Sequence, residues 1–134
     1  MTFEPSVLFH LAVCALFLAV LGEASLKKLW DRETPSWFVS QFAGTWLGRF
    51  PAAPLWWGIA VAELAVAGLF AASVVTGEPW SSARPLLEYG LVGAGFVFAA
   101  LCFGQRVAGD FGGAASGFSY AALSLLLWAA VRLA

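Results

Sequence analysis

Long runs of apolar residues, separated by short polar segments, make up most of the chain. A helix needs about 20 residues to cross the hydrocarbon core of a bilayer, because each residue adds about 1.5 Å to its length. Four runs reach that length, at about 6–29, 54–75, 83–107 and 111–132. The pattern therefore predicts an all-α integral membrane four-helix bundle, with residues 1–134 forming a single four-span domain.

The connection between spans 1 and 2 has a different pattern. Thr34-Pro35 is typical of a helix start, since Thr caps the first turn and Pro fits the first helical position. Phe38, Phe42 and Trp46 then recur every four residues, and polar residues occupy most of the other face. This predicts an amphipathic interfacial helix over about 35–49, lying on the membrane surface or covering a lateral opening in the bundle.

Composition narrows the class of protein. The chain is 61% hydrophobic and only 11% charged, so it lacks the polar surface that a soluble domain requires. We expect it in a lipid bilayer, specifically a bacterial inner (cytoplasmic) membrane. A net charge of -1 without a Lys/Arg run argues against a nucleic-acid partner. The single histidine, His10, and the separated cysteines Cys14 and Cys102 lack metal-ligand spacing, so no metal site is expected.

Charged residues near or within the spans are the candidate site. In an up-down bundle, the end of span 1, the start of span 2, the end of span 3 and the start of span 4 share one side of the membrane. The polar residues that fall there are Glu23, Lys27, Glu63, Arg106 and Asp110. Glu63 lies deepest, and a buried acid is costly unless it is paired or functional. We expect Arg106 to face it; an ion-paired bundle without any ligand is the alternative.

Glycines mark a second feature at the start of span 4. Gly109, Gly113 and Gly117 repeat every four residues, which predicts a groove where another helix can approach closely. Arg106 and Asp110 are also four apart, a spacing that places two residues on one face of a helix. A charged pair is therefore expected beside a tight helix contact.

Several short motifs carry a resemblance to a known family. They are Gly22 with Lys27-Lys28, Pro51, Val61-Ala62-Glu63-Leu64, and the stretch from Phe103-Gly104-Gln105 to Asp110-Phe111-Gly112-Gly113-Ala114. Together they resemble the DoxX family of small four-span membrane proteins. The resemblance implies a compact four-helix bundle, in a family that includes the membrane subunit of a thiosulfate:quinone oxidoreductase. It also implies that Lys27 or Lys28, Glu63 and Asp110 match the polar positions of the family.

Three functions fit these features of the sequence, and they leave open whether the chain is an enzyme. The first is a DoxX-like membrane subunit linked to quinone or sulfur redox metabolism, with a quinone as the possible cofactor and a partner as the electron source. The second is an accessory or assembly subunit that contacts other membrane subunits, or a second copy of itself, without chemistry of its own. The third is a small multidrug-type transporter, suggested by the four spans and an acid in the first span.

Basic residues predict the orientation in the membrane. One end of the bundle is expected to carry Lys27, Lys28, Arg32, Arg49 and Arg106. The other end carries Arg84 and Arg132. Since basic residues concentrate in cytoplasmic loops, both termini are expected on the non-cytoplasmic side.

Overall fold

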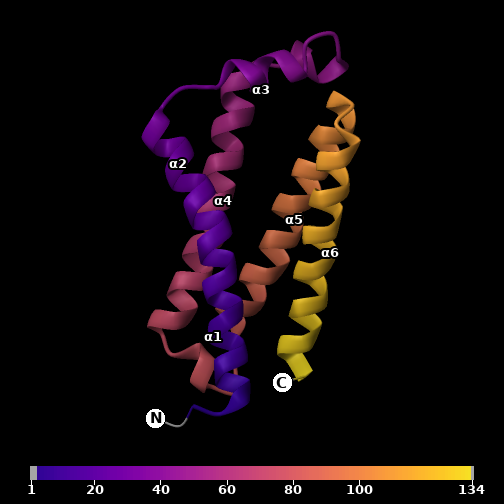
Figure 1. The fold of residues 1–134 in the computed structure, drawn as a ribbon. Helices are drawn as coiled ribbons and strands as arrows, with labels where there is room; N and C mark the ends of the chain where they lie inside the picture. The colour runs from indigo at the N-terminus through magenta and orange to yellow at the C-terminus, as the bar shows by residue number, and fades with distance from the viewer. Residues whose placement is uncertain (1–2, 134) are drawn as a thin grey trace.

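A computed structural model describes residues 3–133 and shows an all-α molecule, without a strand among these residues (Figure 1). Its four candidate membrane spans are Pro5–Asp31, Ala52–Val75, Pro85–Ala108 and Phe111–Leu133. Each is long and apolar enough to cross a membrane, and the four pack as a bundle. The predicted class, an integral membrane four-helix bundle, is confirmed, and every span ends within two residues of its expected position.

The first span is not a uniform α-helix. It consists of α1 (Pro5–Phe17), a π-helical turn η1 (Leu18–Gly22) and α2 (Glu23–Asp31). Pro5 begins α1, where its missing N–H is not needed. A π-turn inserts an extra residue into the helix and disturbs the regular hydrogen-bond ladder. Ser25 Oγ donates to the Gly22 carbonyl at 3.1 Å, which gives that oxygen a partner just beyond the π-turn.

The connector is broken where a single helix over 35–49 was expected. The structure has a short helix α3 (Ser36–Gln41), a turn, and then a 3-10 helix η2 (Trp46–Arg49). Gly44 has a φ of +81°, a backbone conformation that stops a right-handed helix. Phe38 and Phe42 are buried as the amphipathic pattern predicted, whereas Trp46, beyond the turn, is half exposed. The connector runs from the start of α4 across the end of the bundle toward α5 and α6 (Figure 1).

A buried acid organises the opposite end, between α4 (Ala52–Val75) and α5 (Pro85–Ala108). Glu78, in the 3-10 turn η3 (Glu78–Trp80), accepts hydrogen bonds from the backbone N–H groups of Leu86 and Leu87, both at 2.9 Å. Ser73 Oγ also donates to it, at 2.8 Å. These donors include otherwise unpaired N–H groups of the first turn of α5, so Glu78 caps that helix and joins it to α4. This role was not predicted from the sequence.

The turn before α6 (Phe111–Leu133) corrects one expectation about charged residues. Helix α5 ends at Ala108, and Gly109 has a left-handed φ of +81°. Asp110 Oδ1 accepts from the Gly113 N–H at 3.0 Å and caps α6. Arg106 and Asp110 therefore belong to different helices, and the prediction that they share one helical face is wrong because the chain reverses between them.

The glycine groove is partly as predicted. A Cβ on Gly117 would lie 3.2 Å from Cys102 Cα, so α5 and α6 approach closely at this residue. A Cβ on Gly113 would instead meet the side chains of Asp110 and Gln105. Gly109 serves the turn and meets no atom within 4 Å. The small-residue contact is thus made within the bundle, between consecutive spans.

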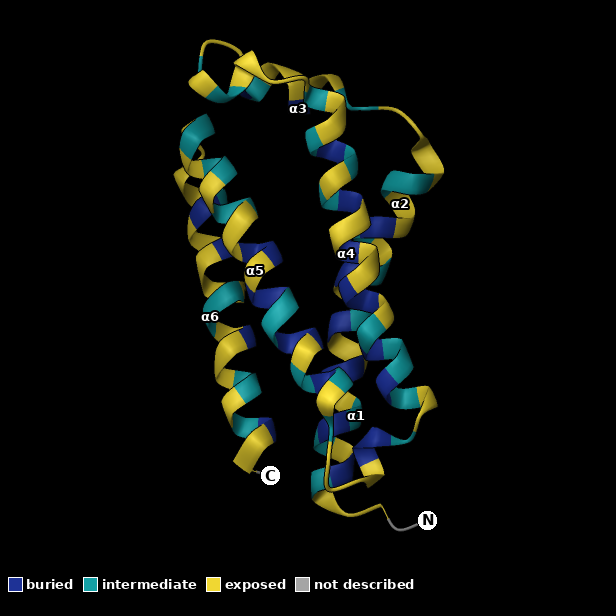
Figure 2. Ribbon diagram, turned by 180° about the vertical axis from the view of Figure 1, so that it is seen from behind, coloured by how far each residue is buried: buried dark blue, intermediate teal, exposed yellow. Residues whose placement is uncertain are grey.

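The main core lies in the half of the bundle away from α3. Phe17 and Phe70 stack there with ring centroids 4.9 Å apart, and Leu21, Leu87 and Leu91 are fully buried around them. Figure 2 shows the buried residues on the facing sides of the helices. Toward the connector, α5 and α6 diverge from α2 and α4 (Figure 1). Close packing fixes one half of the bundle, and the other half leaves room beneath the connector.

Candidate functional site

A buried ion pair lies beneath the connector. Glu63, on α4, is only 3% exposed, and its carboxylate accepts from Lys28 Nζ at 3.0 Å for Oε1 and 2.9 Å for Oε2. The Lys28 side chain, on α2, is 15% exposed. An unpaired carboxylate at this depth would be expensive, so the ammonium is what makes the burial of Glu63 possible.

The expected partner of Glu63 was Arg106, and that expectation is wrong. Arg106 lies in the last turn of α5, is exposed, and its Cζ lies 5.4 Å from the centroid of the Phe111 ring. The reason is tertiary: α2 packs alongside α4 at this level, whereas α5 diverges from α4 toward the connector (Figure 1). A lysine from the neighbouring helix therefore reaches Glu63.

Two tryptophans lie beside the ion pair. Lys28 Nζ is 5.1 Å from the centroid of the Trp56 ring, close enough for a cation–π interaction. Trp56, on α4, is 8% exposed, and Trp37, on α3, meets it edge-on with ring centroids 5.6 Å apart. The aromatic contact holds the connector against α4, and it places α3 over the ion pair.

An apolar cavity of about 480 Å³ opens under α3 between α4 and α5. Its walls are mostly aliphatic and aromatic, including Phe38, Phe42, Ile59, Leu101 and Phe103. Its polar side chains are few, namely Lys28, Gln41, Glu63 and Gln105. An apolar cavity with a few polar groups is the usual form of a small-molecule site.

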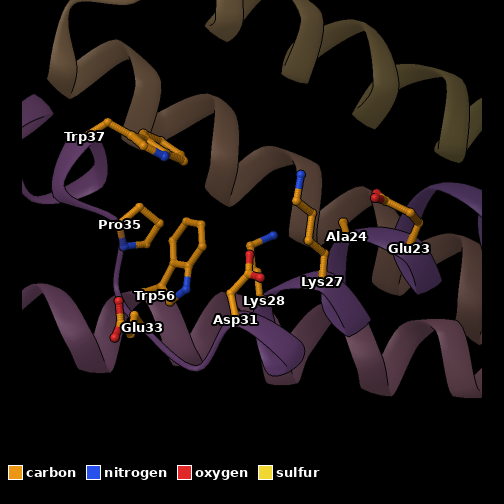
Figure 3. Close-up of a pocket in the computed structure, with 9 residues that line it drawn as sticks. All are labelled: Glu23, Ala24, Lys27, Lys28, Asp31, Glu33, Pro35, Trp37 and Trp56. Carbon is orange, nitrogen blue, oxygen red and sulfur yellow. The ribbon is translucent and has the colours of Figure 1, made fainter.

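A charged groove of about 610 Å³ lies on the other side of the tryptophans. Glu23, Lys27, Asp31 and Glu33 line it, and it shares Lys28, Trp37 and Trp56 with the apolar cavity. Figure 3 shows these side chains around the groove, with the Trp37 and Trp56 rings extending into the same region. Lys28 is thus the one charged residue that lines both spaces among the described residues.

The structure divides the five predicted site residues into three places. Glu63 lines the apolar cavity, and Glu23 and Lys27 line the charged groove. Arg106 and Asp110 lie at the turn between α5 and α6 and line neither space. The predicted single cluster therefore does not form. Glu63 is buried, whereas the other four residues are exposed.

Neither the choice of Lys28 over Lys27 nor the two glutamines of the cavity was predicted from the sequence. The signal for Lys28 was present in the helical register. Leu21 and Ser25 are buried, and Lys28 follows at the spacing that keeps a residue on the same helix face. Gln41 and Gln105 could not be found this way, because they come from elements that meet only in the folded chain.

No group of three or more His, Cys, Asp or Glu residues within the described chain is arranged to hold a metal ion. His10 and Cys14 are both buried in α1, and neither lines the cavity or the groove.

Fold and site together define an integral membrane protein of four helical spans, with an ion pair at the edge of an apolar cavity. No protein-family model, curated protein or solved structure matches the chain. The resemblance to the DoxX family thus rests on the motifs of the sequence and stays a prediction.

Proposed function

We propose that the chain is a DoxX-like membrane subunit linked to quinone or sulfur redox metabolism, and that it binds a quinone in the apolar cavity. The observation that carries the proposal is the placement of the Lys28–Glu63 pair at the edge of that cavity. Reduction of a quinone consumes electrons and protons in equal number, and a partner protein would supply the electrons.

The cavity suits a ligand that is mostly apolar. Its volume of about 480 Å³ falls in the range of roughly 300–1,000 Å³ that small-molecule sites occupy. Aromatic side chains such as Phe38, Phe42 and Phe103 provide flat surfaces against which a ring can stack. The cavity lies near one end of the spans, where a ligand dissolved in the membrane can reach it.

The ion pair provides a hydrogen-bond donor for a carbonyl oxygen of the ligand. The Lys28 ammonium carries three N–H donors and can hydrogen-bond an oxygen acceptor. Glu63 keeps that ammonium in place through two oxygens, at 2.9 and 3.0 Å. Because Lys28 also lines the charged groove, a proton given up at Nζ can be replaced from that polar side.

The first test is whether a quinone occupies the cavity. We expect the chain, purified in mild detergent, to retain quinone that organic extraction and absorbance spectroscopy detect. Ile59→Trp should lower the bound amount at least about tenfold, because Ile59 lines the cavity and a larger side chain fills it. Val61→Trp is the matched control, since Val61 is 60% exposed on the same helix and should leave binding unchanged.

Three results would count against the proposal. Wild-type protein that contains no quinone and binds none when it is added has no quinone site. Equal loss of quinone in Ile59→Trp and Val61→Trp would show that binding does not depend on the cavity. A stable membrane-protein partner recovered without quinone would favour the accessory-subunit function instead.

A further inference from the structure

The first span carries a lateral groove of about 300 Å³, distinct from the apolar cavity beneath the connector. The groove lies between the first span, α5 and α6, and the residues that line it are Leu16, Phe17, Val20, Phe98, Tyr120 and Leu123. Leu16 and Val20 are about half exposed, and both lie well inside the span. This stretch of the span faces the hydrocarbon of the bilayer, so a lipid acyl chain can fill the groove and make van der Waals contacts with its walls.

The charged groove begins about one helical turn further along the same span. Glu23 and Ala24, which line it, come three and four residues after Val20, which lines the lateral groove. The two grooves therefore follow one another along the helix, from the apolar middle of the span toward the connector. Figure 3 shows the Lys27 side chain extending from α2 away from α4, the helix that holds the partner of Lys28.

The charged groove contains charges of both signs that the protein itself does not pair. Lys28 is paired with Glu63, whereas the groove residues Lys27, Asp31 and Glu33 have no hydrogen-bond or ion-pair partner among residues 3–133. Asp31 follows Lys27 by four residues, a spacing that places the two charges on one face of α2. Beyond the lateral groove, the span thus presents a cation and then an acid at its end.

We propose that the lateral groove and the charged groove together bind one glycerophospholipid with an ethanolamine headgroup. An acyl chain lies in the lateral groove, the phosphate binds the Lys27 ammonium, and the lipid ammonium donates hydrogen bonds to Asp31 or Glu33. Acyl chain, phosphate and ammonium follow one another in such a lipid in the same order as their partners along the span. Glu23 adds a third carboxylate to the groove, which disfavours a headgroup of net negative charge. This site does not require a quinone in the apolar cavity.

The headgroup is tested by native mass spectrometry of the purified chain with dioleoyl phosphatidylethanolamine and dioleoyl phosphatidylcholine at equal concentrations. Wild-type protein should bind the ethanolamine lipid about fivefold better, because the choline nitrogen has the same charge but no N–H to donate. Asp31→Asn combined with Glu33→Gln should bring that ratio near one. Glu4→Gln is the control, since Glu4 is exposed but lines neither groove, and it should keep the wild-type ratio.

The acyl chain is tested in the lateral groove. Val20→Trp should lower the binding of both lipids about tenfold, because the larger side chain fills the groove. Leu8→Trp is the matched control, since Leu8 is 50% exposed on the first span and lies outside the groove. A wild-type ratio near one, an unchanged ratio in the Asp31/Glu33 double variant, or equal binding by Val20→Trp and Leu8→Trp would overturn the lipid site. None of these results bears on quinone binding, which is measured separately.

Discussion

At the residue scale, the environment of Glu63 and Lys28 distinguishes them from the other charged residues. Glu23, Lys27, Arg106 and Asp110 are exposed, where water or lipid head groups can solvate them. Glu63 is buried, and its carboxylate has a single compensating ammonium, that of Lys28, at 2.9 Å. Removing one member of a buried pair leaves the other without compensation, which costs far more than losing an exposed charge.

This difference in burial predicts that substituting Lys28 lowers stability much more than substituting its neighbour Lys27. Lys28→Met should destabilise the protein by about 3 kcal/mol, because Glu63 loses its partner. Lys27→Met should change stability by less than about 0.5 kcal/mol, since Lys27 is exposed. Unfolding in detergent, followed by circular dichroism, gives both values.

A second substitution separates the ion pair from other effects at Lys28. Adding Glu63→Gln to Lys28→Met should recover much of the lost stability, since the unpaired charge is gone. Equal losses in Lys27→Met and Lys28→Met would contradict the assignment of Lys28 as the partner.

At the element scale, the contact between α5 and α6 depends on glycine. A Cβ at Gly117 would come within 3.2 Å of the backbone of Cys102, closer than most Cβ atoms approach a neighbour, so a larger residue would require the two helices to shift. In a membrane, such close packing stabilises helix pairs through van der Waals contacts. The glycine therefore sets the separation of the last two spans.

Enlarging this position should separate the helices. Gly117→Leu is expected to cost about 2 kcal/mol through overpacking, measured as a lower melting temperature in detergent. Gly68→Leu is the control, because a Cβ on Gly68 meets no atom within 4 Å and the helix gains a better helix former. If both variants unfold at the wild-type temperature, the close contact contributes nothing to stability.

At the scale of the whole molecule, both described chain ends lie at the end of the bundle opposite the connector (Figure 1). The connector end carries Lys27, Lys28, Arg32, Arg49 and Arg106. Lys28 is paired with Glu63. The remaining basic residues at the connector end still outnumber the two at the opposite end of the bundle, Arg84 and Arg132. The excess favours a cytoplasmic connector.

We therefore expect both termini on the non-cytoplasmic side of a bacterial inner membrane. A reporter enzyme that is active only outside the cytoplasm should be active when fused after the C-terminus. The same reporter inserted at the connector turn, after Gly44, should be inactive. The reverse pattern of activities would show that the orientation is inverted.

The sequence by itself determined the four spans, because apolar length and composition decide whether a helix can cross a membrane. It also indicated Glu63 as a candidate site residue, since an acidic residue deep within a membrane span is rare. Only the tertiary structure decided that Lys28 pairs with Glu63, and that the connector, α4 and α5 line one cavity. Those facts depend on how helices diverge and pack, and the hydrophobic pattern of each helix does not encode which neighbour it meets.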